Sequence, residues 1–351
     1  MLPLQERYYK LRSAEERSLP IVIIVLAVFL FIFIALALCI GRFSSLKPLD
    51  AISILISNIF HLDGGEWTVN QVNVVMKVRL PRVLAAVLVG GALALSGTTF
   101  QSIFRNPLVS SDMLGVSNGA CIGAALAILY NLGTVATQVL AFVFGIIAVL
   151  MTTTIPRLMK RNTAITLVLS GIIVSGFMSS IIGVIKYIAD TDTQLPDIVY
   201  WTMGTFSKVK MANIYAMGPL ILFVGLILLA LSWRLNLLSL SESEARTLGV
   251  NVRRERRIAI ISATLLTASS VCLTGTIGWI GLIMPHIGRK LVGSNNVRCL
   301  PVSMLVSAIF MLIIDTLART VTAGELPLSI LTGALGAPFF AFILVKQREV
   351  E

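Results

Sequence analysis

Few side chains in this sequence of 351 residues could carry out chemistry. The candidates are two histidines and four cysteines without regular spacing: His61, His286, Cys39, Cys121, Cys272 and Cys299. The sequence contains no H-E-x-x-H zinc motif, no G-x-x-x-x-G-K-[ST] phosphate loop and no acidic cluster at metal-ligand spacing. We therefore predict no catalytic centre, no bound metal or cofactor, and no nucleotide site within this chain.

Charged residues inside apolar runs are the next candidates, because a charge within a membrane helix is costly and commonly functional. Lys186 lies near one end of its run, and we expect its long side chain to reach the lipid headgroups. Asp315 and Arg319 are spaced i,i+4 in "DTLART", so they can pair on one helix face. A structural pair is the expected role of Asp315, and a proton relay is the alternative. We expect His61 on the surface and His286 in a packing or capping role.

The elements that must position these residues are membrane helices. The chain is 56% hydrophobic and 13% charged, whereas soluble domains carry about 25% charged residues. A net charge of +11 could suggest nucleic-acid binding, but that function needs a basic face on a folded soluble domain. Here the basic residues occupy short gaps between apolar runs. The composition predicts an all-α polytopic membrane protein whose surroundings are lipid, with no nucleic-acid partner.

Ten apolar runs are candidates for crossing the membrane. They are Pro20–Ile40, Leu80–Phe104, Leu114–Tyr130, Ala136–Ile155, Ala164–Ile188, Ile214–Trp233, Ile258–Leu273, the short run Ile277–Ile287, Leu300–Val321 and Pro327–Val345. The short run contains Pro285, so a count of nine is the alternative. Ten crossings place every large basic cluster and both termini in the cytoplasm, as the positive-inside rule requires. We predict a cytoplasmic segment over residues 1–19 and one transmembrane domain over residues 20–351.

One polar stretch, "SESEARTLGVNVRRERR" at Ser241–Arg257, lies between two apolar runs. In the ten-helix count it belongs to the longest inner loop, about residues 234–257. The pattern predicts a short helix with these parts: Ser241 or Ser243 as cap, Glu244 in the first turn, Ala245 and Leu248 on one face, and Gly249 as the C-terminal stop. Such a helix suits a groove in another protein. The alternative is a basic loop held at the anionic lipid surface.

Six motifs in order resemble the permease subunits of binding-protein-dependent ABC importers for iron–siderophores, haem and cobalamin, the FecCD-type family. They are "RLPR" at Arg79–Arg82, "GGALALSGTTFQSIFRNPL" at Gly90–Leu108, "LGVSNGA" at Leu114–Ala120, "SEARTLGVNV" at Ser243–Val252, "GTIGWIGLIMPHIGR" at Gly275–Arg289 and "ELPLSILTGALGAPFFAFIL" at Glu325–Leu344. The resemblance extends from about Pro20 to the C-terminus.

The resemblance implies a ten-helix permease of the type II ABC importer architecture in a bacterial or archaeal cytoplasmic membrane. Its implied partners are a second permease copy or paralogue, a cytoplasmic ABC ATPase dimer and an extracytoplasmic substrate-binding protein. The inner loop would form the coupling helix that sits in the ATPase, through Glu244, Ala245, Leu248, Gly249 and Val250. Ferric siderophore is the commonest cargo of the family and is therefore the expected one.

Two further sites follow from the resemblance. Matching arginines, here Arg79, Arg82 and Arg319, bind acidic residues of the binding protein; anchoring at the membrane interface is the alternative, and Asp315 could occupy Arg319. A cytoplasmic gate falls at Asn106, Pro107 and Leu108. Independently of any family, Pro107 removes a backbone donor and restricts Asn106, so the helix must break there. A plain helix-ending turn is the alternative.

A transporter driven by an ion gradient is the main alternative function. It should show paired acids within the membrane or unwound helices that hold an ion. Asp315 is thin support for it. The segments Ser96–Gly115 and Thr274–Gly293 also place a hydroxyl–Gly pair, a Pro and a Gly at equal spacings. An internal repeat and a chance recurrence both account for this similarity.

Overall fold

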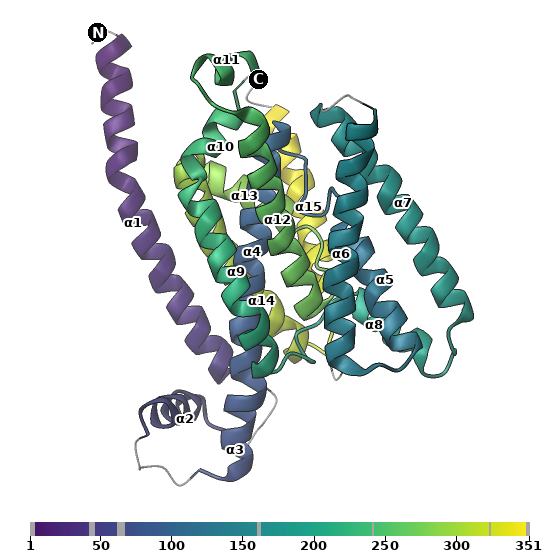
Figure 1. Cartoon of the computed structure of the whole chain (residues 1–351). Coiled ribbons are helices and arrows are strands. Elements are labelled where there is room, and N and C mark those ends of the chain that lie inside the picture. Colours follow the sequence, from purple (N-terminus) through teal and green to yellow (C-terminus); the bar gives the residue numbers. More distant parts are fainter. Residues whose placement is uncertain are drawn as a thin grey trace.

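The computed structural model describes residues 4–41, 46–61, 67–159, 163–240, 242–322 and 324–348. Within these residues the chain forms helices and connecting turns, and no β-strand (Figure 1). The first half contains α1 (Leu4–Cys39), α2 (Pro48–Phe60), α3 (Val69–Asn73), a π-helical segment (Val74–Arg79), α4 (Leu80–Phe104), α5 (Val116–Leu129), α6 (Gly133–Leu158) and α7 (Ala164–Ile188).

The second half contains α8 (Gln194–Thr202), α9 (Met211–Ala230), α10 (Ser232–Leu238), α11 (Glu242–Thr247), α12 (Val252–Thr274), α13 (Ile280–Val292), α14 (Asn296–Thr320) and α15 (Leu328–Arg348). Each of the ten expected apolar runs overlaps one of the longer helices. The prediction of an all-α polytopic fold is therefore confirmed.

Seven described segments are long and apolar enough to cross a membrane: Leu19–Cys39, Val69–Phe104, Gly133–Leu158, Ile165–Ile188, Met211–Ala230, Val252–Thr274 and Asn296–Thr320. The other three expected crossings correspond to α5, α13 and α15. With 14 and 13 residues, α5 and α13 are shorter than the roughly 20 residues that a bilayer core requires. The count of ten crossings therefore stays an interpretation, in which α5 and α13 span only part of the membrane.

The helices of the bundle differ in how much of their surface they bury. In the apolar window of α4, 83% of the residues are buried, against 11% in that of α1. Figure 1 shows α4 and α12 in the middle of the bundle, with α1 and α7 at opposite edges. Glycines allow the close packing at the centre. A Cβ on Gly97 would overlap the carbonyl oxygen of Gly281 in α13, and one on Gly90 would lie 2.7 Å from the carbonyl oxygen of Ser307 in α14.

The segments Ser96–Gly115 and Thr274–Gly293, which have a hydroxyl–Gly pair, a Pro and a Gly at equal spacings, pack against each other. Gly97 of the first segment lies against Gly281 of the second, and the Gln101 side chain donates to the Leu282 carbonyl at 3.2 Å. Each segment ends on a glycine with a left-handed backbone, Gly115 at φ 77° and Gly293 at φ 81°. This common ending is an observation that an internal repeat would account for.

The two ends of the bundle carry different elements. Both chain termini lie at the end that also carries α11, and α2 and α3 lie at the opposite end (Figure 1). An even number of crossings produces this arrangement. The helix α1 begins at Leu4 and continues through Pro20, so the expected boundary between residues 19 and 20 falls inside one helix. The sequence analysis missed α2, whose Ala51 and Ile54 pack with Val75 in a small separate core.

Candidate functional site

The polar stretch of the inner loop forms a short helix, as predicted. Helix α11 covers Glu242–Thr247, and its end is closed by hydrogen bonds from the Leu248 amide to the Glu244 carbonyl and from the Val250 amide to the Ala245 carbonyl, at 3.3 and 3.2 Å. Gly249 has φ 74°, a backbone conformation that glycine adopts without Cβ strain. The predicted stop at Gly249 is confirmed. Ser241, one of the two expected caps, lies outside the described residues.

Ala245 and Leu248 do not share one outward face, and that expectation was wrong. Ala245 is 1% exposed and belongs to the main hydrophobic core, whereas Leu248 is 61% exposed. The reason is that α11 packs against α10 and α12, and the small alanine is on the side that faces them. Glu244, Leu248 and Gly249 are exposed, and α11 lies at the end of the molecule that carries the termini (Figure 1). These three residues are therefore accessible to a partner.

The expected gate residues form an exposed turn at the inner end of α4. Asn106, Pro107 and Leu108 are all exposed. The Asn106 side chain accepts from the Leu108 amide at 2.9 Å, and Arg105 closes α4 with φ 52°. Such Asn-centred turns mimic a backbone turn and fix the direction of the following chain. The helix therefore ends as predicted, and the gate stays a prediction.

Beyond this turn the chain returns into the bundle. The Ser111 carbonyl accepts from the Thr267 hydroxyl of α12 at 3.3 Å, and the Leu114 carbonyl accepts from the Thr152 hydroxyl of α6 at 3.0 Å. A Cβ on Gly281 would contact Ser111. Because buried carbonyls must be satisfied where water is absent, these hydroxyls allow an irregular segment to run within the bundle. The sequence analysis did not predict this re-entrant loop.

Gln101 links the turn to α13. Its amide donates to the Val109 and Leu282 carbonyls at 3.0 and 3.2 Å, and its side-chain oxygen accepts from Arg289 at 2.6 Å. The loop after α4 and the helix α13 are thereby tied to one side chain. Gln101 thus connects α13 with Val109, directly after the expected gate.

The three arginines expected to dock a binding protein lie at the end of the bundle opposite α11. Arg79, Arg82 and Arg319 are 3%, 4% and 7% exposed. Arg79 donates to the Leu38 and Cys39 carbonyls at 2.6 and 2.9 Å. Groups of the chain itself therefore bind these arginines. A docking role stays a prediction, and a binding protein would have to reach the arginines by way of neighbouring residues.

Arg82 is the centre of a buried ion network. It pairs with Asp315 of α14 and with Glu325 of the α14–α15 loop, each at 2.7 Å. The expected pair of Asp315 with Arg319 is present but longer, at 3.5 Å. Asp315 is completely buried, whereas Glu325 keeps 30% of its side chain exposed. The sequence analysis missed Glu325, although it starts the last quoted motif and follows an arginine-bearing helix.

The remaining candidates have simple surroundings. His61 ends α2 on the surface with φ 50°. His286 is buried and packs edge-on against Phe340 at 6.1 Å, in agreement with the expected packing role. Lys186, in the last turn of α7, is half-buried and lines a cleft between helices. The expected reach of its side chain to the lipid headgroups stays a prediction.

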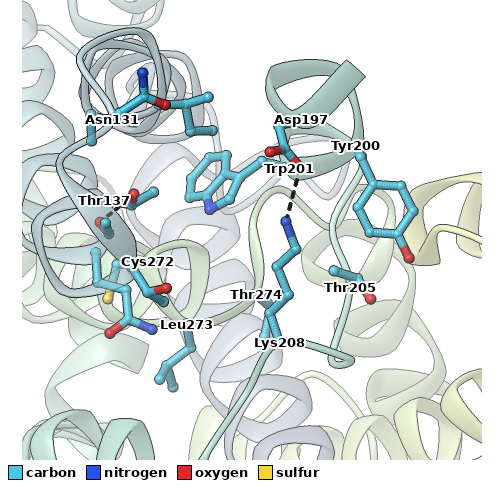
Figure 2. A pocket seen from close by; sticks show the side chains of 15 residues that line it. Asn131, Thr137, Asp197, Tyr200, Trp201, Thr205, Lys208, Cys272, Leu273 and Thr274 are labelled. Carbon is cyan, nitrogen blue, oxygen red and sulfur yellow. Dashed lines mark hydrogen bonds and ion pairs between the residues drawn. The ribbon is translucent and has the colours of Figure 1, made fainter. Parts of the chain in front are cut away.

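An outer pocket of about 260 Å³ lies between α5, α6, α8 and α12. Figure 2 shows Lys208 and Asp197 at this pocket, joined by an ion pair at 3.2 Å. The Lys208 ammonium also lies 5.9 Å from the ring centre of Tyr200. Asp197 and Tyr200 both come from α8, so this short helix supplies both partners of Lys208.

Comparison with known proteins now identifies the family. Residues 26–346 match the model of the FecCD transport family. The chain belongs to the FecCD transport family. A molybdate import system permease, MolB of Haemophilus influenzae, is 42% identical over 79% of this chain and 82% of that protein. A permease of an iron chelatin transport system from Helicobacter pylori is 38% identical over 88% of this chain and 93% of that protein.

A solved structure agrees with this assignment. An inward-facing metal-chelate type ABC transporter matches with a TM-score of 0.82 and 38% identity, over 94% of this chain and 100% of that chain. The FecCD chain described here is thus a permease of an ABC importer in the inner, cytoplasmic membrane, where it works with a separate ATPase subunit and a substrate-binding protein. The expectation that a partner hydrolyses the ATP is confirmed.

Proposed function

We propose that this permease passes a metal chelate, with ferric siderophore as the expected cargo, from the external binding protein to the cytoplasm. The likeness to the metal-chelate type transporter over nearly the whole chain supports this cargo class. Molybdate is the second candidate, because the 42% identical relative is a molybdate permease. The exposed end of α11 supports the importer mechanism over an ion-gradient carrier, since a chain without a phosphate loop needs a surface that receives force from an ATPase.

In this proposal the coupling segment comprises Glu244, Ala245, Leu248, Gly249 and Val250. Leu248 is the apolar contact with the ATPase, and burying an exposed leucine is worth about 1.5–3 kcal/mol. Ala245 acts from inside: it anchors α11 to α10 and α12, so that force on Leu248 reaches the transmembrane helices. The domain limits, residues 1–19 and 20–351, belong to the same proposal.

The proposal also assigns roles to the two ends of α4, binding-protein docking at the outer end and a gate at the inner end. At the outer end, an acidic residue of the binding protein approaches the network of Arg79, Arg82 and Arg319 and competes for Arg82 with Glu325, its partly exposed carboxylate. At the inner end, Asn106, Pro107 and Leu108 form a gate that α13 moves through Gln101 and Arg289. Docking outside and opening inside would then both act on α4.

Reconstitution tests the cargo and the energy source together. The permease is placed in liposomes with its ATPase and binding protein, and ATP-driven uptake of a radiolabelled ferric siderophore is compared with uptake of molybdate. We expect uptake of the siderophore, and none when the ATP site of the partner is disabled. Uptake driven by an ion gradient without the ATPase would contradict the importer mechanism. Uptake of molybdate alone would replace the cargo and keep the mechanism.

A further inference from the structure

A polar cleft of about 390 Å³ lies where α5, α7 and α8 meet the segment before α13 and the start of α15. Hydroxyl and amide side chains make up much of its wall: Ser117, Asn118, Ser179, Thr202, Thr276 and Ser329. The Thr202, Thr276 and Ser329 hydroxyls donate to backbone carbonyls of the chain. Ser179 and Lys186 are therefore the polar side chains of the wall that can bind a molecule in the cleft.

Helix α7 turns one particular face toward the cleft. Ser179, Ile182 and Lys186 line it, and their i, i+3, i+7 spacing places them on one side of a helix. The opposite side of α7 exposes apolar side chains, among them Phe177 and Val184 at 55% and 61%. The helix is therefore polar toward the cleft and apolar away from it, and Lys186 is on the polar side.

The cleft contains two charged side chains with unequal surroundings. Asp112 accepts from the Ser117 amide at 2.7 Å and lies at the N-terminal end of α5, where the helix dipole favours negative charge. Among the described residues Lys186 forms no ion pair and no hydrogen bond. The end of α5 thus stabilises the Asp112 carboxylate. The half-buried ammonium of Lys186 stays available for an anion.

We infer that this cleft binds an anionic, oxygen-rich cargo and that Lys186 is the residue that selects negative charge. The inference rests on the proposed import function for the identity of the cargo and narrows it to oxyanions and negatively charged chelates. The Ser179 hydroxyl can donate to a cargo oxygen, and the Lys186 ammonium compensates the cargo charge in surroundings poorer in water than the bulk solvent. Neutral and cationic chelates would leave Lys186 uncompensated.

A thiol reporter tests this inference without knowledge of the cargo. Ser179→Cys is introduced after the four native cysteines are replaced by alanine or serine, and the full-length permease is reconstituted with its ATPase in phosphatidylcholine vesicles. Ser179 is exposed to the cleft and lies two helical turns, about 10 Å, from Lys186. Labelling rates are measured with an anionic sulfonate and a cationic trimethylammonium methanethiosulfonate, each divided by the rate of a neutral reagent.

We expect the anionic reagent to react faster, Lys186→Gln to lower the anion-to-cation ratio on the order of tenfold, and Lys186→Arg to preserve it. An unchanged neutral rate in Lys186→Gln shows that the cleft is intact. An equal ratio in the parent and in Lys186→Gln would overturn the inference. So would a preference that disappears when phosphatidylglycerol is added, because a lipid headgroup would then be the anion. No ATP is consumed here, so this result and a failure of uptake are separate outcomes.

Discussion

Arg82 of α4 and Asp315 of α14 form a buried ion pair, with Nη2 and Oδ1 2.7 Å apart, although 233 residues separate them in the chain. Arg82 also binds Glu325 at 2.7 Å, so one guanidinium holds two helices and the loop after α14. Within a low-dielectric interior such a pair is sensitive to the loss of one partner, because the other charge is left uncompensated.

We therefore expect Asp315→Asn to destabilise the permease by about 3 kcal/mol. Glu325→Gln should cost less, roughly 1 kcal/mol, since that side chain is partly solvated. Thermal unfolding of the detergent-solubilised protein measures both. The control is Asp197→Asn, which breaks the Lys208 pair, where both partners are more than half exposed. Equal melting temperatures for Asp315→Asn and the control would contradict the structural role of the pair.

Charge reversal of Arg82 to Glu should abolish folding and not merely weaken docking, because the new carboxylate would face Asp315. Docking is better tested at Glu325, which solvent reaches. Glu325→Gln should raise the affinity of the permease for its binding protein at low salt, because it removes a carboxylate that repels an acidic partner and competes for Arg82. Glu325→Lys should raise the affinity further, because the new ammonium attracts the same acid. Affinity is measured by surface plasmon resonance on nanodiscs. The same affinity for all three proteins would remove the binding-protein contact from this network.

Gly249→Val should uncouple transport while leaving insertion intact. The positive φ of Gly249 would strain a branched residue by about 1–3 kcal/mol. No neighbouring atom lies within 4 Å of a Cβ placed there, so strain and not a clash is the expected cause. Gly249→Asn is the matched control, because asparagine tolerates left-handed backbone. Co-purification of the ATPase and its stimulation by the loaded binding protein are the measurements. Full stimulation in Gly249→Val would show that the turn is dispensable for coupling.

Leu248→Ser should weaken ATPase binding about tenfold, as expected when an exposed leucine loses its burial in an interface. Ala245→Trp should instead lower the melting temperature, because Ala245 packs inside the permease. The two substitutions thus distinguish the contact of Leu248 with the ATPase from the packing of Ala245 inside the permease. If Leu248→Ser binds the ATPase with parental affinity, the apolar contact lies elsewhere on the inner face.

Gly97→Ala should lower the melting temperature, since its Cβ would overlap the Gly281 carbonyl and separate α4 from α13. The matched control is Gly183→Ala in α7, where no atom lies within 4 Å of the added Cβ. There the change should be neutral or stabilising by up to about 1 kcal/mol, because alanine favours helix. An equal decrease of the melting temperature in both variants would indicate that the effect comes from helix geometry and not from packing between helices.

Local patterns in the sequence predicted local structure well. Apolar run length predicted the long helices, and a lone glycine after a short polar helix predicted the left-handed stop at Gly249. Contacts between distant segments were not predictable in this way. The bond between Arg82 and Glu325 joins residues 243 positions apart, and Ala245 faces inward because of how α10 and α12 meet around it. Spacing within one helix suggested the Asp315–Arg319 pair, yet the shorter bond of Asp315 goes to another helix.

The helix α1 ends with carbonyls that other parts of the chain must satisfy. Its Leu38 and Cys39 carbonyls are bonded by Arg79, and its Ala37 carbonyl by Arg319, which follows 282 residues later. At about 5–20 residues per second, a ribosome needs on the order of tens of seconds to reach Arg319. During synthesis Arg79 therefore reaches the end of the first helix early, whereas a nascent chain that stops short of α14 leaves the Ala37 carbonyl without Arg319. Completion of the outer surface is thus one of the last events in the biogenesis of this permease.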